Sequence, residues 1–365
     1  MKILITGADG FVGRNLKIEL INRKYNDIIE INNYNNAELL MQYIDECDFI
    51  FHLLTVYRSD DTTVFERINA DITKMIVELI GNRQKSLLLL SSTQVENGSA
   101  YGQSKLKAEE IIKNWIAATG NKAYICRLSN EFGKWCPPDL NSVVATFCNN
   151  IANNKDIHIN NPDSQLKLMY IDDIINYFIS ILEDRINSIY FEIEPVYETT
   201  VGEIAKILKT FHTMRSESNI PDMEDMLIKK LYSTYLSYLS TDAFSTSLEP
   251  HTDDRGSFTE LFHFGSMGQV SVNISKPGIT KGNHWHHTKN EKFVVIRGTG
   301  IIRFRKVGES EIIEYHVSED KIEVMDIPPG YTHNITNTGE IDMMTIMWAN
   351  EIFDNNRPDT YYEEV

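Results

Sequence analysis

Three histidines and a glutamate near the end of the sequence have the spacing of metal ligands. Residues 278–298 read G-x5-H-x-H-x4-E-x6-G, which puts His284, His286 and Glu291 at ligand positions, and a later P-x-G-x2-H-x3-N block adds His333. Imidazole and carboxylate together suit zinc, manganese, iron or nickel better than calcium or magnesium. We therefore expect a divalent metal, in the first instance zinc, although such histidines can also act directly as bases.

A tyrosine and a lysine four residues apart could protonate a carbonyl oxygen. Tyr101 and Lys105 form a Y-x-x-x-K pair, and this spacing puts both side chains on one face of a helix. An ammonium beside a phenol favours the phenolate, so we expect the pKa of Tyr101 to be lowered towards neutrality. The hydroxyls of Ser91, Ser92 and Thr93 precede the pair and could lie nearby.

Glycines after the first apolar run indicate a dinucleotide site. Residues 7–13 read G-x-x-G-x-x-G between a predicted strand and a predicted helix. Such a turn lets the backbone approach a pyrophosphate, which the helix N-terminus stabilises. Asn32, rather than an acidic residue, ends the next predicted strand, and Arg14 lies at the helix start, so NADPH is favoured over NADH. Arg14 could instead only cover the helix N-terminus. The expected cofactor-binding residues in this region are Gly7, Asp9, Gly10, Phe11, Val12, Gly13, Arg14 and Asn32.

The predicted secondary structure that positions these groups is mixed α/β in the first part of the sequence and all-β in the second. In the first half, apolar segments that read as buried strands alternate with helical stretches, which predicts a Rossmann-type, doubly wound α/β fold with a parallel sheet. These strands are expected at 2–6, 27–32, 46–54, 86–92 and 123–130, with helices that include 71–81 and 105–120. After about residue 250, short strands separated by Gly, Pro and Asn predict an all-β sandwich or barrel. We place the domains at 1–245 and 246–365, with a linker helix at about 223–239.

The composition narrows the choice of partners and compartment. The formal net charge is −17 without a block of lysine or arginine, which disfavours nucleic acid and anionic membranes as partners. Four cysteines show no C-x-x-C spacing, and no apolar run is long enough to cross a bilayer. We expect a reduced, cytoplasmic protein.

Residues 1 to about 240 resemble the extended short-chain dehydrogenases/reductases, a family of sugar-nucleotide epimerases, dehydratases and reductases. The resemblance rests on the glycine turn, the Y-x-x-x-K pair and the S-S-x strand end. It implies that Tyr101 is the catalytic acid/base, that Lys105 binds the nicotinamide ribose and that Thr93 polarises the substrate oxygen. In one departure, Thr93 and Tyr101 are only eight residues apart, where most members of the family have about two dozen between them.

Two further segments carry the same resemblance. Residues 48–54 match a D-x-x-x-H-L-A motif on the cofactor side, which adds Leu53 to the implied cofactor contacts, although Leu54-Thr55 replaces the usual Ala-Ala. Residues 127–133 match R-x-x-N-x-x-G, which implies that Arg127 and Asn130 contact the substrate.

The second part of the sequence resembles the cupins, small double-sheet (double-stranded β-helix or jelly-roll) barrels. Residues 254–260 and 281–284 are similar to segments of deoxysugar-nucleotide epimerases of that fold. The resemblance implies that His284 removes a proton next to a keto group, while Lys281, Arg255 or the metal holds the enolate oxygen. A metal-bound His284 lacks a free nitrogen pair, so the two uses are exclusive unless His286, His287 or Tyr331 shares the work.

The combination of both parts resembles bifunctional enzymes of bacterial capsular polysaccharide synthesis. It implies epimerisation at carbon 3 of a UDP-4-keto-6-deoxy-N-acetylhexosamine and then reduction at carbon 4 with NADPH, to UDP-N-acetyl-6-deoxy-L-talosamine. A homodimer through the cupin domain is implied as well. Two alternatives stay open: a 3,4-ketoisomerase cupin joined to a reductase, and a single-function reductase with a non-catalytic, metal-binding cupin dimerisation module.

Overall fold

Continuous apolar runs in the first half of the chain form a parallel sheet. The computed structural model describes residues 1–32, 37–354 and 356–365. The sheet has the order β2-β1-β3-β4-β5, and all its neighbouring strands are parallel. These strands are covered on both faces, which is why they read as unbroken apolar runs. Their bounds are β1 (Ile3–Thr6), β2 (Ile28–Ile31), β3 (Phe49–His52), β4 (Ser86–Ser92) and β5 (Ala123–Leu128).

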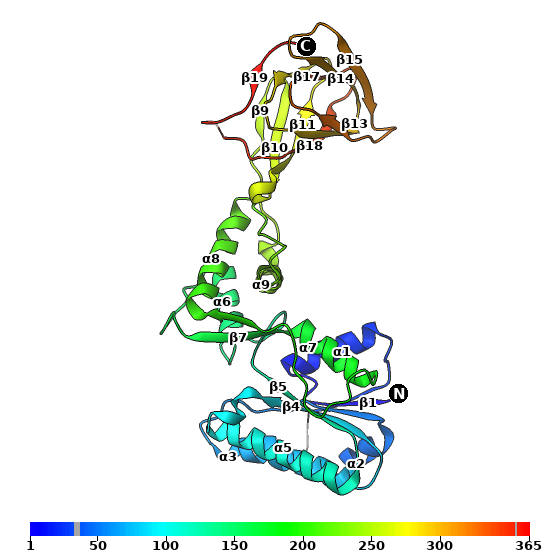
Figure 1. The fold of residues 1–365 in the computed structure, drawn as a ribbon, viewed down its shortest axis with the longest axis vertical. Helices are drawn as coiled ribbons and strands as arrows, with labels where there is room; N and C mark the ends of the chain where they lie inside the picture. Colours follow the sequence, from blue (N-terminus) through cyan, green and yellow to red (C-terminus); the bar gives the residue numbers. More distant parts are fainter. Residues whose placement is uncertain (33–36, 355) are drawn as a thin grey trace. The chain divides into compact units, whose positions relative to one another are not determined.

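Helices cover the two faces of this sheet (Figure 1). Helices α1 (Phe11–Asn22) and α7 (Ile171–Leu182) pack with apolar strand residues in one cluster. On the other face, α2 (Ala37–Glu46), α4 (Ile72–Ile80) and α5 (Ala100–Thr119) form a second cluster. The predicted doubly wound α/β fold is confirmed. Short helical segments lie at α3 (Thr63–Phe65), η1 (Glu66–Asp71) and η2 (Thr93–Glu96).

The helix that carries Tyr101 starts earlier than predicted. A helix was expected at 105–120, but α5 begins at Ala100, because the Ser99 side chain caps it by accepting a hydrogen bond from the Gly102 backbone N–H at 3.0 Å. Tyr101 and Lys105 therefore belong to the same helix, and Tyr101 lies in its first turn.

A smaller sheet and further helices complete the first half. Strands β6 (Asn130–Phe132), β7 (Gln165–Tyr170) and β8 (Tyr197–Thr200) are joined in that order. This part of the chain also contains three helices, α6 (Val143–Ala152), α8 (Val201–Ser216) and α9 (Met226–Leu236), and a short helical segment, η3 (Thr241–Ala243). The predicted linker helix corresponds to α9 and is shorter than expected. Within the described parts of the chain, every helix is too short or too polar to span a lipid bilayer.

The chain divides into two units, and a segment before residue 240 groups with the second of them. One unit holds residues 1–209 and 230–240, and the other holds 210–229 and 241–365. Residues 210–229 belong with the second unit because Ser218 and Ile220 form backbone hydrogen bonds with His263, at 3.0 and 2.8 Å. The boundary near residue 245 stays a prediction.

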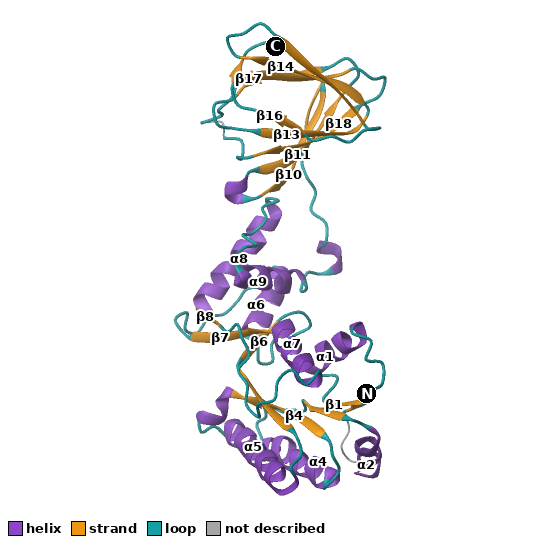
Figure 2. Ribbon diagram, turned by 45° about the vertical axis from the view of Figure 1, so that its right-hand side comes forward, coloured by secondary structure: helices purple, strands orange, loops and turns teal. Residues whose placement is uncertain are grey.

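The second unit is built from antiparallel sheets, as Figure 2 shows. One has the order β16-β13-β18-β11-β10-β9 and the other the order β15-β14-β17-β12-β19. Buried and less buried residues alternate along β13 and β14, and the buried apolar side chains of the unit, such as Phe293, Ile302 and Ile335, form the core. The predicted all-β second domain is confirmed.

The strand bounds in the second unit locate its functional residues. They are β9 (His251–Asp253), β10 (Gly256–His263), β11 (Gln269–Ser275), β12 (Thr280–Trp285), β13 (Glu291–Arg297), β14 (Thr299–Lys306), β15 (Ile312–Ser318), β16 (Met325–Ile327), β17 (Tyr331–Asn337), β18 (Met343–Ala349) and β19 (Tyr361–Tyr362), with η4 at Gly265–Met267.

Candidate active site and metal centre

The glycine turn after β1 needs its glycines because the backbone is tightly packed there. Gly7 has φ +73°, and a Cβ on it would lie 2.9 Å from the backbone of Leu54. A Cβ on Gly13 would lie 2.3 Å from the carbonyl oxygen of Gly7. Gly10 precedes α1 without a side-chain cap, so the first backbone N–H groups of α1 are available to an anion.

A cavity of about 240 Å³ lies at this turn and at the carboxyl ends of β1, β3 and β4. Such a position is where open α/β sheets bind ligands. The predicted residues that line the cavity are Gly7, Gly10, Phe11, Val12, Gly13, Leu53, Thr93, Tyr101 and Asn130. The other residues predicted near the cofactor, Asp9, Arg14, Asn32 and Lys105, are not among the lining residues in the described chain.

Those other residues make contacts of their own. The Asn32 amide donates a hydrogen bond to the Asp9 carboxylate. The Arg14 guanidinium lies over the Trp135 ring, 4.7 Å from its centroid. The buried Lys105 ammonium donates to the Thr55 hydroxyl at 3.0 Å. Thr55 lines the cavity, so Lys105 sits directly behind the cavity wall.

The ionisation of Tyr101 differs from the expectation. Burial raises its pKa to about 12, a hydrogen bond with Ser92 opposes the rise, and the charge of Glu131 adds to it. Burial also lowers the pKa of Lys105 to about 7. The spacing predicted a lowered tyrosine pKa, but Lys105 is itself easily neutralised and its ammonium points to Thr55. In this state the phenol is a protonated hydrogen-bond donor.

Ser92 and Thr93 both line the cavity together with Tyr101. Ser92 hydrogen-bonds with Tyr101 and also accepts from the Gln94 backbone N–H at 3.2 Å. The Thr93 hydroxyl points to the Leu128 carbonyl oxygen at 3.4 Å, and its side chain is exposed at the cavity. Sequence reasoning named Thr93, and the two adjacent hydroxyls at the end of β4 were the signal for both.

Arg127 is held away from the cavity. Its guanidinium forms a two-pronged contact with the fully buried Glu109 carboxylate, at 2.8 and 2.7 Å. Ser91 and Tyr190 also donate to Glu109, at 2.6 and 2.9 Å. This network joins β5 to α5. Asn130, by contrast, is exposed at the cavity, and its amide donates to the Lys167 carbonyl oxygen at 3.3 Å.

Glu131 is a cavity residue that sequence reasoning missed. It lines the same cavity as Tyr101, burial raises its pKa to about 7, and the nearby Lys105 charge opposes that rise. Its position directly after Asn130 in the R-x-x-N-x-x-G segment was the available signal.

In the second unit, the four predicted metal ligands come together from neighbouring strands. His284 in β12 lies opposite His333 in β17, while His286 and Glu291 come from the end of β12 and the start of β13. One potential ligand atom from each of the four lies within 4.8 Å of the others. The Nε2 atoms of His286 and His333 are each 3.4 Å from the Glu291 carboxylate.

The donor atoms of this cluster fit a first-row divalent metal. Nε2 of His286, Oε2 of Glu291 and both ring nitrogens of His333 are buried and make no hydrogen bond within the described residues. Buried polar atoms without partners are costly, and a bound cation would satisfy them. Burial, followed by the charge of His333, lowers the pKa of His284 to about 4, so its imidazole is neutral at pH 7. Burial would raise the pKa of Glu291, but His286 and His333 outweigh it and hold the pKa below its usual range.

A cavity of about 400 Å³ lies beside the cluster. His284 and His333 line it together with the predicted Lys281 and Arg255, and His251 is a lining residue that the sequence did not indicate. Burial lowers the pKa of Lys281, whose ammonium donates to the Asn273 side chain at 2.7 Å and the Ile274 carbonyl oxygen at 2.9 Å. Arg255 is mostly exposed and paired with Asp253 at 2.7 Å.

A β-bulge in β12 sets which side chains reach this cavity. Gly282 pairs with Asn334 and His284 with His333, so Asn283 is an additional residue between them. Gly282 has φ +107°, and a Cβ there would lie 2.7 Å from the His333 carbonyl oxygen, while Asn283 has φ +59°. The bulge therefore depends on a close backbone approach that glycine allows.

A parallel sheet with a glycine turn and a Tyr–Lys helix defines the first unit as a nicotinamide-dependent oxidoreductase domain, and the chain belongs to the NAD dependent epimerase/dehydratase family, which matches residues 3–191. Residues 251–361 match the polysaccharide biosynthesis C-terminal domain. The predicted resemblance to extended short-chain dehydrogenases/reductases is confirmed, and a preference for NADPH remains a prediction.

Relatives match the chain over its whole length. It is 39% identical to the UDP-2-acetamido-2,6-beta-L-arabino-hexul-4-ose reductase of Pseudomonas aeruginosa, over 99% of this chain and 98% of that protein. It is similar to a crystal structure of the capsular polysaccharide assembling protein CapF from Staphylococcus aureus, with a TM-score of 0.93, 46% identity and 100% coverage of both chains. A UDP-glucuronic acid 4-epimerase from Bacillus cereus, 19% identical with a TM-score of 0.53, covers 58% of this chain and 84% of its own and shares the fold alone. The predicted resemblance to capsule-synthesis enzymes is confirmed.

Proposed function

We propose that the protein is a bifunctional sugar-nucleotide enzyme of surface polysaccharide synthesis. The second domain epimerises carbon 3 of a UDP-4-keto-6-deoxy-N-acetylhexosamine, and the first reduces the 4-keto group with NADPH to UDP-N-acetyl-6-deoxy-L-talosamine. The observation that carries the proposal is that Tyr101, Ser92 and the glycines of the first turn line one cavity. The full-length match to a 4-ketohexulose reductase supports the substrate class.

In the reductase domain, Tyr101 donates the proton. The nicotinamide cofactor supplies a hydride to carbon 4 when it is bound. As the carbonyl oxygen gains negative charge, Tyr101 transfers its proton to that oxygen, and the hydroxyl of Ser92 or Thr93 holds the oxygen in place. Lys105 lies behind Thr55, where it can hold the cofactor ribose and return a proton to the phenolate.

In the cupin-type domain, the proton on carbon 3 is acidic because the adjacent ketone can form an enolate. A neutral His284 accepts this proton, Lys281 or Arg255 stabilises the enolate oxygen, and a proton from solvent is delivered to the opposite face of carbon 3, after which His284 releases its proton to solvent. Zinc, held by His284, His286, Glu291 and His333, would supply a Lewis acid when bound. His284 belongs to both the cluster and the cavity wall, so base and ligand are alternative uses of this residue.

Hydrogen exchange tests the two reactions separately. The full-length protein is incubated in heavy water with the UDP-4-keto-6-deoxy sugar and without NADPH, and carbon 3 is followed by NMR. Deuterium uptake at carbon 3 supports epimerisation, and added NADPH should then trap the reduced product. Movement of the carbonyl to carbon 3 would indicate a 3,4-ketoisomerase instead. Reduction without any exchange would leave a single-function reductase with a metal-binding module.

The cofactor preference has its own test. Asn32 directly follows β2 with an amide, and an aspartate there would repel a 2′-phosphate while accepting a hydrogen bond from a free ribose hydroxyl. We expect Asn32→Asp to shift the ratio of kcat/KM for NADPH over NADH towards NADH by about 10-fold or more. An unchanged ratio would contradict NADPH selection at this position.

We also propose that the enzyme is a cytoplasmic homodimer that pairs through its second domain. Ile312, Ile313 and Tyr315 are exposed on β15, which lies at the edge of its sheet. Ile313→Glu should lower the mass measured by light scattering to that of a monomer, and an unchanged dimer mass would place the interface elsewhere.

A further inference from the structure

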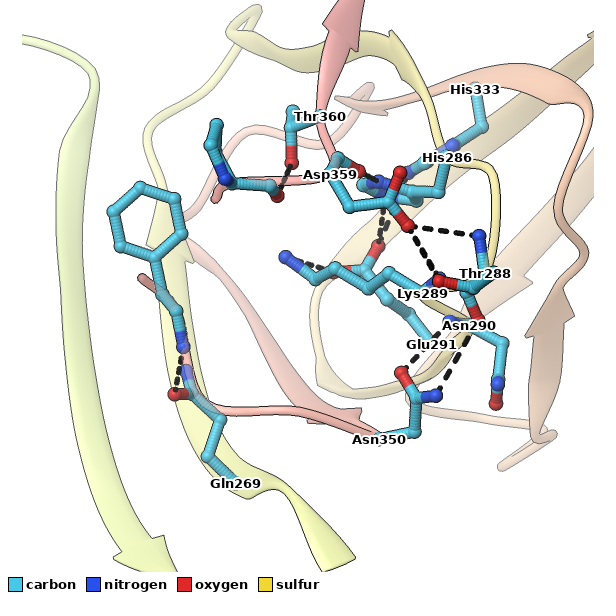
Figure 3. Close-up of polar contacts among 12 residues, drawn as sticks. Gln269, His286, Thr288, Lys289, Asn290, Glu291, His333, Asn350, Asp359 and Thr360 are labelled. Carbon is cyan, nitrogen blue, oxygen red and sulfur yellow. Dashed lines mark hydrogen bonds and ion pairs between the residues drawn. The ribbon is translucent and has the colours of Figure 1, made fainter. Parts of the chain in front are cut away.

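The loop that carries the metal ligand His286 is held by an aspartate more than seventy residues later in the sequence. The 286–290 loop connects β12 to β13, and Asp359 lies against it (Figure 3). The Asp359 carboxylate accepts hydrogen bonds from the consecutive backbone N–H groups of His287, Thr288 and Lys289, at 3.0, 2.8 and 2.8 Å. The Thr288 hydroxyl donates to the same carboxylate at 3.1 Å. One carboxylate thus fixes the whole turn between two metal ligands.

The backbone of Asp359 acts on His286 itself. Its carbonyl oxygen lies 2.6 Å from Nδ1 of His286. A carbonyl oxygen can only accept, so Nδ1 carries the proton and Nε2 keeps its lone pair. That Nε2 is the buried atom without a hydrogen bond, 3.4 Å from the Glu291 carboxylate. The contact with Asp359 therefore selects the imidazole tautomer that can bind a metal.

The conformation of Asp359 lets one residue make both contacts. The backbone φ of Asp359 is +38°, which lies in the left-handed region that residues other than glycine rarely adopt. Such a conformation persists where surrounding contacts hold it. Beyond it, β19 pairs with β12, with Tyr362 opposite His284 and Tyr361 stacked on Trp285 at 5.0 Å. The 356–365 segment is thus fastened next to two of the four ligands.

We propose that Asp359 is a positioning residue of the metal centre: its carboxylate fixes the 286–290 loop and its carbonyl oxygen sets the tautomer of His286. The affinity for zinc then depends on a residue that does not touch the metal. This inference goes beyond the proposed reactions and rests only on the ligand cluster, so it holds whether the metal is catalytic or structural.

Zinc affinity of the full-length protein tests the proposal. The metal is removed with a chelator, and zinc binding is measured in competition with a chromophoric chelator. Partners of this kind change metal affinity by about 10- to 100-fold. We expect Asp359→Ala to lose about that much, and Asp359→Asn to lose less because the amide oxygen can still accept from the loop. The control is Asp354→Asn, which removes the same charge from an exposed residue that accepts from the Asn356 backbone N–H.

The proposal fails if Asp359→Ala binds zinc as tightly as the wild type, or if Asp354→Asn loses as much affinity as Asp359→Asn. A second measurement covers the case in which the Asp359 variants do not fold. In wild-type protein labelled with ¹⁵N-histidine, the His286 resonances, assigned with His286→Gln, should report a proton on Nδ1. A proton on Nε2 in the metal-free protein would overturn the proposal.

Discussion

The cavity of the first unit and the cavity of the second both contain a group able to move a proton, and burial favours its neutral form in both, but the second cavity lies beside a buried carboxylate that stays ionised. In the first, burial favours the neutral forms: the pKa of Tyr101 rises to about 12, that of Lys105 falls to about 7 and that of Glu131 rises to about 7. In the second, the imidazoles keep Glu291 ionised although it is buried. Both cavities therefore hold a neutral group suited to a proton transfer, and the ligand cluster beside the second adds a negative charge that a cation can neutralise.

The two cavities also differ in how their groups are assembled. Tyr101 and Lys105 come from one helix, so local geometry positions them. The candidate metal ligands come from β12, the loop that follows it, β13 and β17, and their alignment depends on strand register and on Asp359. A substitution in the first site should therefore mainly remove a reacting group, whereas a substitution near the second can also misplace the remaining ligands.

The largest expected effect separates the two reactions. Tyr101→Phe removes the proton donor, so NADPH oxidation should fall by about 10²- to 10⁴-fold while deuterium exchange at carbon 3 stays as in the wild type. Initial rates of both reactions on one preparation provide the measurement. Tyr177→Phe, on α7, is the control and should leave both rates near wild type. Loss of exchange in Tyr101→Phe would contradict separate sites.

In the second unit, the next largest effect is expected from removing the negative charge of Glu291. Glu291→Gln should weaken zinc binding by about 100-fold or more, since the charge that attracts the cation is gone. In the wild type, zinc at about 100 times its Kd should stabilise the fold by about 2.7 kcal/mol, and the variant should lose this gain. Calorimetry with and without zinc gives the result. Equal stabilisation of both proteins would exclude Glu291 as a ligand.

The adjacent hydroxyls of Ser92 and Thr93 should contribute unequally to the reduction. Ser92 contacts the phenol and Thr93 points to a backbone carbonyl, so Ser92→Ala should reduce kcat by about 10- to 100-fold and Thr93→Ala by less. The two variants are compared under saturating NADPH and substrate. The opposite order would show that Thr93 turns to the substrate oxygen when substrate binds.

The smallest effect concerns stability. Lys105 has a pKa of about 7 in the fold and near 10.5 when unfolded. Below pH 7 Lys105 is charged in both the folded and the unfolded protein, and the cost of burying the ammonium destabilises the fold in full. Between pH 7 and 10.5 the folded protein holds a neutral lysine while the unfolded protein still holds a charged one. The destabilisation is therefore relieved progressively as the pH rises through this range. Lys105→Met should raise Tm by about 2–6 °C near pH 6 and by less near pH 9. Lys113→Met, on the same helix, should show no such pH dependence, and an equal gain at both pH values for Lys105→Met would refute the assignment.

The features that could be predicted from the sequence are those set by local spacing. The glycine turn, the buried strands and the metal-ligand spacing each depend on residues close together in the chain. Burial is not visible in spacing, so the Y-x-x-x-K pattern predicted the wrong direction for the pKa of Tyr101. Likewise, Arg127 belongs to a network with Glu109, and His286 depends on Asp359, because tertiary packing brings these pairs together.

The bulge at Asn283 has a consequence for the register of β12. In a regular strand, residues three apart face opposite sides, yet Lys281 and His284 both line the second cavity because the additional residue reverses the alternation. If Asn283 were instead paired as a regular strand residue opposite His333, every amino acid of the site would still be present, but Lys281 and His284 would face opposite sides of β12. The register of β12, and not only the identity of its residues, therefore determines whether the site is formed.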